Sequence, residues 1–347
     1  MNRRHFLYQA SALAFAKDLV SASGKNASRI GLCTFSCHQH WKAVESGQEK
    51  VKYTDTSGFY RYSRDLGSEG VQTSLRGTPV KEFRKLMEET GGYYEGDLRL
   101  PKSKSDLNGF EAEVTRTREA GATVARAVLT GGRRYEIFKT LEDFQAFQKQ
   151  AVLSLALAEP ILCRHQLKLA LENHKDQTTT ELVDLITSIS SEWIGVLVDT
   201  GNNIALLEEP HSVVESLAPY ALSVHLKDMA VAATDDGFHL SEVPLGTGAL
   251  DLSRIINVLA RANPSLVFNL EMATRDPLLV PCLREDYFAT FPGQKAERLG
   301  KMMQWIKENP PRRDCPRISN KPLSLVIAEE EENNLHSLQW MRENIHA

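Results

Sequence analysis

Eight short apolar runs, separated by helix-like stretches, constrain the fold of this chain more than any other feature. Several of the later stretches begin with polar capping residues, as helices do. The candidate strands are 29–35, 69–75, 91–100, 123–129, 167–173, 194–200, 222–228 and 266–272. Strands that alternate with helices are typical of parallel βα units, and eight such units close into a barrel. We therefore predict an α/β fold of the (β/α)8, or TIM-barrel, type.

The length of the chain agrees with one such barrel. A (β/α)8 barrel needs about 250 residues, and residues 29–310 supply that length. The segment 36–68 is long for a connection between a strand and a helix, so we predict that it covers the site as a lid.

Residues 311–347 are expected to form a linker and a C-terminal helical appendage. Leu325, Leu335 and Leu338 of that helix are expected to dock on the barrel exterior. The acidic run at 329–332 is expected to face solvent, because like charges in sequence favour hydration.

The N-terminal residues 1–24 resemble a twin-arginine export signal. Arg3 and Arg4 precede a short apolar stretch, and Val20-Ser21-Ala22 offers small residues for cleavage. This predicts an exported, periplasmic protein. A basic amphipathic helix on a cytoplasmic protein is the alternative.

Composition excludes several classes of partner. The net charge of −4 provides no basic surface for a nucleic acid. Five scattered cysteines do not form a disulfide framework, and no apolar run reaches the length of a membrane-spanning helix. A small molecule is therefore the expected partner, and the oligomeric state, homo-oligomers included, stays open.

Four polar side chains share one position in four successive strands. Glu172, Asp199, His225 and Glu271 each lie near the carboxyl end of a strand, on the face with smaller or more polar neighbours. Because strand side chains alternate between faces, the bulky face should pack on the helices and these four should point into the barrel. That end of a barrel is where active sites are built.

Three carboxylates and an imidazole would repel one another unless a positive charge lay between them. Oxygen and nitrogen donors without thiolate suit Mn²⁺, Mg²⁺, Co²⁺, Zn²⁺ or Fe²⁺. We therefore predict one divalent metal ion held by Glu172, Asp199, His225 and Glu271.

The sequence resembles the xylose isomerase-like TIM-barrel superfamily, and within it the sugar phosphate isomerase/epimerase group. The resemblance covers residues 29–310 and rests on five motifs: ENH at 172–174, DTGN at 199–202, HLKD at 225–228, PLGTGALD at 244–251 and LEM at 270–272. It implies that Glu172 and Glu271 bind the metal and act as the acid/base pair, with Asp199 and His225 completing the ligand set. It also implies a carbohydrate substrate; if the chain is exported, a free or oxidised sugar fits better than a phosphorylated one.

Further residues are weaker candidates. Lys227 has the same strand parity as His225 and is predicted to polarise a carbonyl or to pair with a carboxylate. His174 and Asn202 are expected to bind substrate hydroxyls or to cap loops, and Arg275 to hold an anion or form an ion pair. His38 and His40 are expected to contact the sugar unless their segment is only a tethered loop. Asp228 is expected to support the site or cap a loop.

The predicted reaction is isomerisation or epimerisation through an enediolate, with the glutamates moving the proton. A lyase or dehydratase would use the same intermediate to expel a substituent. A phosphodiesterase would need more histidines and a basic surface, and a sugar-binding module would need no metal chemistry. Retained activity after Glu-to-Gln substitution would reject the first hypothesis.

Overall fold

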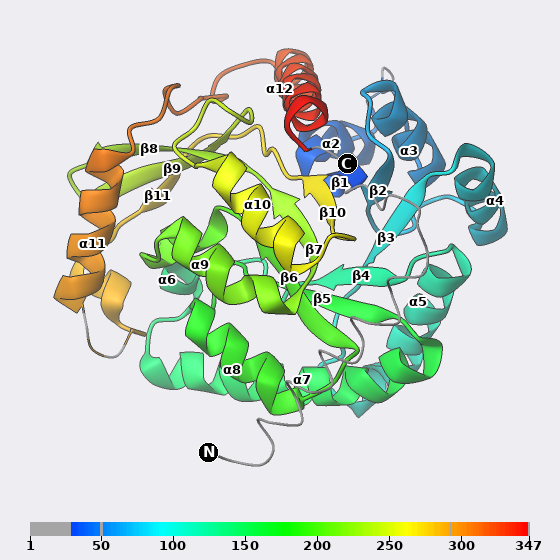
Figure 1. Ribbon diagram of the computed structural model, residues 1–347, viewed down its shortest axis with the longest axis horizontal. Coiled ribbons are helices and arrows are strands. Elements are labelled where there is room, and N and C mark those ends of the chain that lie inside the picture. Colours follow the sequence, from blue (N-terminus) through cyan, green and yellow to red (C-terminus); the bar gives the residue numbers. More distant parts are fainter. Residues whose placement is uncertain (1–28, 49–50, 292, 294, 346–347) are drawn as a thin grey trace.

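Eight parallel strands form a closed barrel in the computed structural model, which describes residues 29–48, 51–291, 293 and 295–345 (Figure 1). The strands are β1 (Arg29–Cys33), β2 (Gly70–Gln72), β3 (Tyr93–Asp97), β4 (Val124–Ala127), β5 (Lys168–Glu172), β6 (Ile194–Asp199), β7 (Ala221–Leu226) and β10 (Val267–Leu270). Each overlaps one predicted strand, and β10 pairs with β1 to close the ring. The prediction of a (β/α)8 barrel is confirmed; the predicted export signal lies outside the described residues.

Helices surround the barrel and follow most of its strands (Figure 1). They are α2 (His38–Glu45), α3 (Thr56–Asp65), α4 (Val80–Thr90), α5 (Leu107–Glu119), α6 (Arg134–Ile137), α7 (Leu141–His165), α8 (Thr179–Ile189), α9 (Pro210–Leu217) and α10 (Leu252–Ala262). Helix α8 shows why they begin where they do. Thr178 and Glu181 form a reciprocal capping box, and the buried Leu182 and Ile186 follow on one face.

The strands carry bulky apolar side chains toward the helices and polar ones toward the barrel axis. Leu169 and Leu171 of β5 are fully buried in the hydrophobic core, as are Val196 and Val198 of β6. Because neighbouring positions point to opposite faces, the alternate positions are left for polar groups inside the barrel.

The segment between β7 and β10 contains strands that were not predicted from the sequence. β8 (Asp228–Thr234) and β9 (Gly237–Val243) form an antiparallel hairpin, and β11 (Leu278–Val280) pairs with β9. Asp235 and Asp236 make the turn, and Gly237, the first residue of β9, has a positive φ of 149°. The hairpin holds Glu242 in the site described below.

The segment 36–68, which was predicted to cover the site as a lid, includes two helices among its described residues. It contains α2 and α3, and Trp41, Phe59 and Tyr60 from these helices are buried in the core. Their burial anchors the segment to the barrel.

Two helices, α11 (Lys295–Glu308) and α12 (Leu323–Asn344), follow β10. Helix α12 packs on β1, β10 and α2, and Leu338 and Met341 join the barrel core (Figure 1). The docking prediction was wrong for Leu325 and Leu335, whose side chains are exposed. We propose that α12 belongs to the barrel as the helix that covers β1 and β10.

The acidic run in α12 does not lie wholly in solvent. Glu330 is buried and accepts hydrogen bonds from the backbone N–H groups of Gln39 (2.7 Å) and His40 (3.0 Å) at the start of α2. The prediction of a solvated face was wrong for this residue, because backbone N–H groups at the start of α2, which have no partner within the helix, donate to the oxygens of its carboxyl group.

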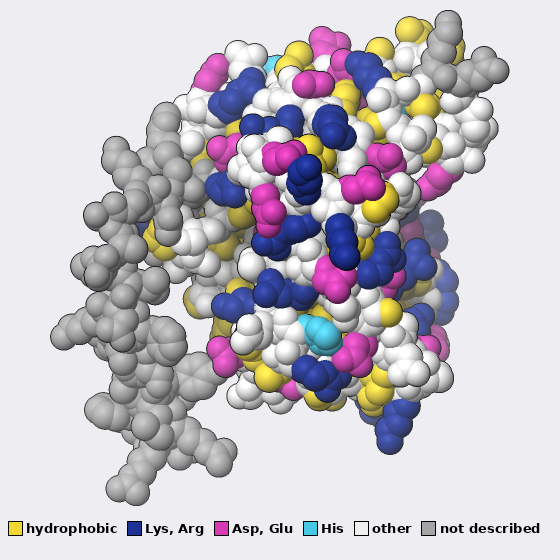
Figure 2. Space-filling view, turned by 90° about the vertical axis from the view of Figure 1, so that its right-hand side faces the viewer, with side chains coloured by type: hydrophobic (Ala, Val, Ile, Leu, Met, Phe, Trp, Pro, Cys, Tyr) yellow, Lys and Arg dark blue, Asp and Glu magenta, His cyan; other side chains and the backbone are white. Residues whose placement is uncertain are grey.

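The described part of the chain includes no helix with the length and apolar character needed to cross a membrane. On the face shown in Figure 2, Lys and Arg side chains are interspersed with Asp and Glu side chains.

Candidate metal centre and the pocket beside it

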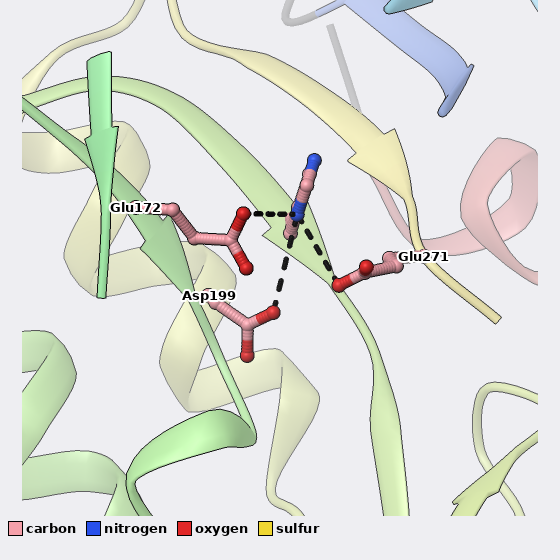
Figure 3. Close-up of side chains that lie close together, drawn as sticks. Glu172, Asp199 and Glu271 are labelled. Carbon is pink, nitrogen blue, oxygen red and sulfur yellow. Dashed lines mark ion pairs between the residues drawn. The ribbon is translucent and has the colours of Figure 1, made fainter. Parts of the chain in front are cut away.

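The four polar side chains predicted to converge do so at the carboxyl ends of β5, β6, β7 and β10. One donor atom from each of Glu172, Asp199, His225 and Glu271 lies within 4.8 Å of the other three, and all four residues are buried. Figure 3 shows the three carboxylates directed at one imidazole nitrogen. His225 Nδ1 lies 3.2 Å from Glu271 Oε2, 3.7 Å from Glu172 Oε2 and 4.0 Å from Asp199 Oδ2.

Gln72 sets the orientation of the imidazole. Its amide nitrogen donates to Glu95 Oε2 at 2.8 Å, so its carbonyl oxygen faces His225 Nε2 and can only accept a hydrogen bond there. Nε2 therefore donates, and Nδ1 is left facing the carboxylates without a hydrogen bond among the described residues. Burial alone would lower the pKa of His225, but Glu271 and Glu172 raise it well above its usual value.

Arg126 of β4 holds one side of the centre. Its Nε donates to Glu172 Oε2 at 2.5 Å and its Nη1 to Asp97 Oδ1 at 3.0 Å, while Asn202 donates to Glu172 Oε1 at 3.0 Å. Burial raises the pKa of Glu172, but Arg126 and then His225 outweigh it, and the pKa lies below its usual range. Glu172 is therefore ionised in the folded protein.

Lys227 holds the other side, and its side chain points inward as predicted. Its Nζ lies 2.8 Å from Asp199 Oδ2 and 2.6 Å from Glu271 Oε2. Burial raises the pKa of Asp199 to about 7 against the opposing effect of Lys227. For Glu271, Lys227 and His225 overcome burial and lower the pKa well below its usual value.

This set of side chains fits a divalent cation. The backbone N–H groups of Gly201 and Asn202 hold Asp199 Oδ1, so Oδ2 is the oxygen left for the cluster. Three carboxylates and an imidazole nitrogen without a hydrogen bond provide the hard, mixed donors that Mg²⁺, Mn²⁺, Zn²⁺ and related ions accept. The bond between His225 and Gln72 is the kind of outer contact that orients a metal-binding histidine.

A cavity of about 150 Å³ lies beside the cluster, and most of the remaining predicted site residues line it. Its walls include His174, Asn202, Lys227, Glu271 and Arg275. Arg275 forms a bidentate ion pair with Glu242, at 2.6 and 3.1 Å, so the ion-pair alternative for this residue is the observed one.

His38 and His40 do not line this cavity. His40 Nε2 lies 3.3 Å from the carbonyl oxygen of Tyr53 and its ring stacks on Tyr53, with centroids 3.9 Å apart. His38 stacks on Phe35 and lies 2.9 Å from the Phe35 carbonyl oxygen. Both side chains serve the packing of α2 in this structure, and their predicted sugar contacts remain predictions.

Gln72, Glu95, Arg126 and Lys175 lie at the cluster or its cavity but were not predicted from the sequence. Gln72, Glu95 and Arg126 are polar residues within barrel strands, so the parity test used for the later strands would have drawn attention to them. Lys175 follows the end of β5, where strand parity does not apply, and only the structure shows that it is buried beside the cavity.

A second cavity, of about 670 Å³, adjoins the first. Arg126, Val128 and Gly131 contribute to the walls of both, and the larger cavity extends over the ends of β2, β3 and β4. The two together provide room for a sugar-sized molecule next to the cluster.

A family model described as xylose isomerase-like TIM barrel matches residues 60–309 of the chain. The chain belongs to this family. The match covers every barrel strand from β2 to β10, so the whole cluster falls inside it.

Two curated proteins match parts of this family member. The 3-oxo-isoapionate decarboxylase of Pectobacterium atrosepticum is 34% identical over 106 residues, which is 30% of this chain and 38% of that protein. The uncharacterized protein YihM of Escherichia coli is 27% identical over 168 residues, 47% of each chain. The matches thus span less than half the length of either relative.

Solved structures of low sequence identity share the fold. D-psicose 3-epimerase from Clostridium cellulolyticum, solved with D-tagatose, has a TM-score of 0.61 and 12% identity, covering 92% of this chain and 100% of the other. A xylose isomerase-like protein from Mycobacterium smegmatis, solved with magnesium, has a TM-score of 0.54 and 17% identity, covering 82% and 100%. At these identities the likeness establishes the barrel fold.

Proposed function

We propose that this protein is a divalent-metal-dependent isomerase or epimerase that acts on a sugar or keto-sugar derivative through an enediolate. The observation that carries the proposal is the buried cluster of Glu172, Asp199, His225 and Glu271 beside a cavity. Epimerases and a magnesium complex among the structural neighbours support it.

The four clustered side chains would hold the cation, and the bound ion would supply Lewis-acid stabilisation of negative oxygen charge. Glu271 lines the cavity and is the candidate base for a proton alpha to the substrate carbonyl. Glu172 would return the proton to the intermediate. Lys227 and Asn202 face the same cavity, where they would orient substrate oxygens.

The ion pairs of Glu172 and Glu271 favour a second candidate function, that of a lyase which removes CO2 from the substrate. Arg126 and Lys227 hold both carboxylates in the ionised, weakly basic form. A decarboxylase needs no base for its first step, because loss of CO2 from a 3-oxo acid leaves the electron pair on the substrate as an enolate. The decarboxylase among the relatives agrees with this lyase alternative.

Metal analysis and isotope exchange test the proposal. Purified protein should contain one divalent ion per chain, and a screen of keto-sugars in D2O should find one that gains deuterium. Glu271→Gln should abolish the exchange, because it removes both the candidate base and one of the four metal ligands, whereas Glu113→Gln, on the exposed face of α5, should not. CO2 release without exchange into substrate would select the lyase candidate, and a protein without bound metal that exchanges no sugar would contradict both.

Export through the twin-arginine pathway remains a prediction. Sequencing the N-terminus of the mature protein from a periplasmic fraction tests it; a full-length chain in the cytoplasm would contradict it.

A further inference from the structure

Lys175 is a buried cation for which the described residues provide no counter-ion. Only 3% of the residue is exposed, and its side-chain nitrogen donates a hydrogen bond to Asn202 Oδ1. Within the described parts of the chain, Lys175 forms no ion pair. Burying an ammonium group without an opposite charge is costly, so this arrangement calls for an anion.

The neighbouring cations already have their carboxylates. Lys227 pairs with Asp199 and Glu271, and Arg275 pairs with Glu242. On the far side, Arg126 pairs with Glu172 and Asp97.

Asn202 Oδ1 also accepts from Lys227, at 3.3 Å, so two ammonium groups converge on one amide oxygen. An amide oxygen carries no net charge and cannot neutralise either of them. The nearby carboxylates belong to the cluster and pair with its flanking cations, Arg126 and Lys227. The positive charge of Lys175 is therefore available to pair with a bound ligand.

Lys175 also lies where a ligand would meet it. It lines the small cavity together with His174, Arg133 and Glu271. The loop that carries Arg133 is fixed to the Lys175 segment by a hydrogen bond from Arg134 N to Lys175 O, at 2.8 Å. Arg133 is partly exposed and pairs with Glu136, so among the described residues that line the cavity Lys175 is the cation without a carboxylate partner.

We propose that the substrate of this site is an anionic sugar, specifically a sugar acid, and that the ammonium group of Lys175 binds its carboxylate. The inference rests on the proposed function, because it assigns a ligand to the same cavity. A phosphate ester offers the same anionic oxygens, but a single buried ammonium in a cavity of about 150 Å³ matches one negative charge better than two.

Three matched probes test the proposal by calorimetric titration of the metal-loaded protein. They are D-fructose, 2-keto-D-gluconate and D-fructose 1-phosphate. Their carbon 1 is, in that order, a hydroxymethyl group, a carboxylate and a phosphorylated hydroxymethyl group. 2-Keto-D-gluconate should bind at least about tenfold more tightly than D-fructose, as one charged hydrogen bond allows. Lys175→Met should abolish that preference, Lys175→Arg should retain part of it, and the exposed Lys81→Met should leave it unchanged.

Equal affinities for D-fructose and 2-keto-D-gluconate would overturn the proposal, as would a preference that survives in Lys175→Met or the absence of binding by both anions. Tighter binding of D-fructose 1-phosphate, lost in Lys175→Met, would overturn the carboxylate assignment in favour of a phosphate. Metal content is measured separately without sugar. Bound metal and sugar turnover without an anion preference would reject this inference alone, whereas a protein that binds no metal would reject the proposed function.

Discussion

His225 and Gln72 form a hydrogen bond that decides which nitrogen of the imidazole faces the three carboxylates. Gln72 Oε1 accepts from Nε2, and Glu95 fixes the amide in that orientation by accepting from Gln72 Nε2 at 2.8 Å. Ser223 and Asn269 donate to the same Glu95 oxygen, at 2.7 and 2.8 Å. A buried network of hydrogen bonds inside the barrel therefore supports the cluster.

Replacing Gln72 should weaken metal binding although the residue is not a predicted ligand. In Gln72→Met the imidazole loses its acceptor and is free to rotate or change tautomer, and metal affinity should fall by about 10–100-fold. Competition with a metal chelator measures this, with the exposed Gln304→Met as the control. Unchanged affinity would mean that the hydrogen bond does not orient the ring.

Lys227 should stabilise the metal-free protein and compete with the metal ion for the carboxylates of Asp199 and Glu271. Lys227→Met leaves Asp199 and Glu271 without their ammonium partner, so the unfolding free energy of the metal-free protein should fall by about 3–5 kcal/mol. An added divalent ion should then raise Tm more in the variant than in the wild type, because it replaces the lost charge. Thermal unfolding with and without Mn²⁺ measures both effects, and an equal rise in the two proteins would argue against competition between Lys227 and the metal.

Asp228 should be needed to hold the loop after β9. Its carboxylate accepts backbone N–H groups from Met229, Gly246, Gly248 and Leu250, at 2.8 to 3.1 Å, which confirms the loop-capping alternative. Asp228→Asn turns an amide N–H toward two of these donors and should destabilise the protein by about 1–3 kcal/mol. Urea unfolding measures this, with Asp65→Asn on an exposed position of α3 as the control. A loss no larger than that of the control would count against the capping role.

Glu330 should make stability depend on pH. Burial raises its pKa to about 8, against the hydrogen bonds from the N–H groups of Gln39 and His40. Since the folded pKa exceeds the unfolded one, the stabilisation is fully present below pH 4.5 and is lost as the pH rises toward 8.

The variant Glu330→Gln cannot ionise, so the stability difference between wild type and variant should shrink between pH 5 and pH 8. The change is at most about 1.4 kcal/mol per pH unit. Unfolding by urea at both pH values measures it. A difference that stays constant over this range would place the pKa of Glu330 outside it.

Strand periodicity in the sequence was enough to predict the barrel and the cluster. Apolar runs that recur with helix-like stretches between them specify (β/α)8 units, and side-chain alternation placed Glu172, Asp199, His225 and Glu271 on the inner face. These are local properties of each strand, so they can be read without knowing which strands are neighbours.

The tertiary structure alone decided which charges meet. The burial of Glu330 depends on α12 lying against α2, and the pairing of Arg275 with Glu242 depends on the β8–β9 hairpin. Folding brings Lys227, not Lys175, into contact with Asp199 and Glu271, and this leaves Lys175 without an ion pair in the described part of the chain. Electrostatic energy depends on distance and burial, and for residues far apart in the chain both are set only when the barrel closes.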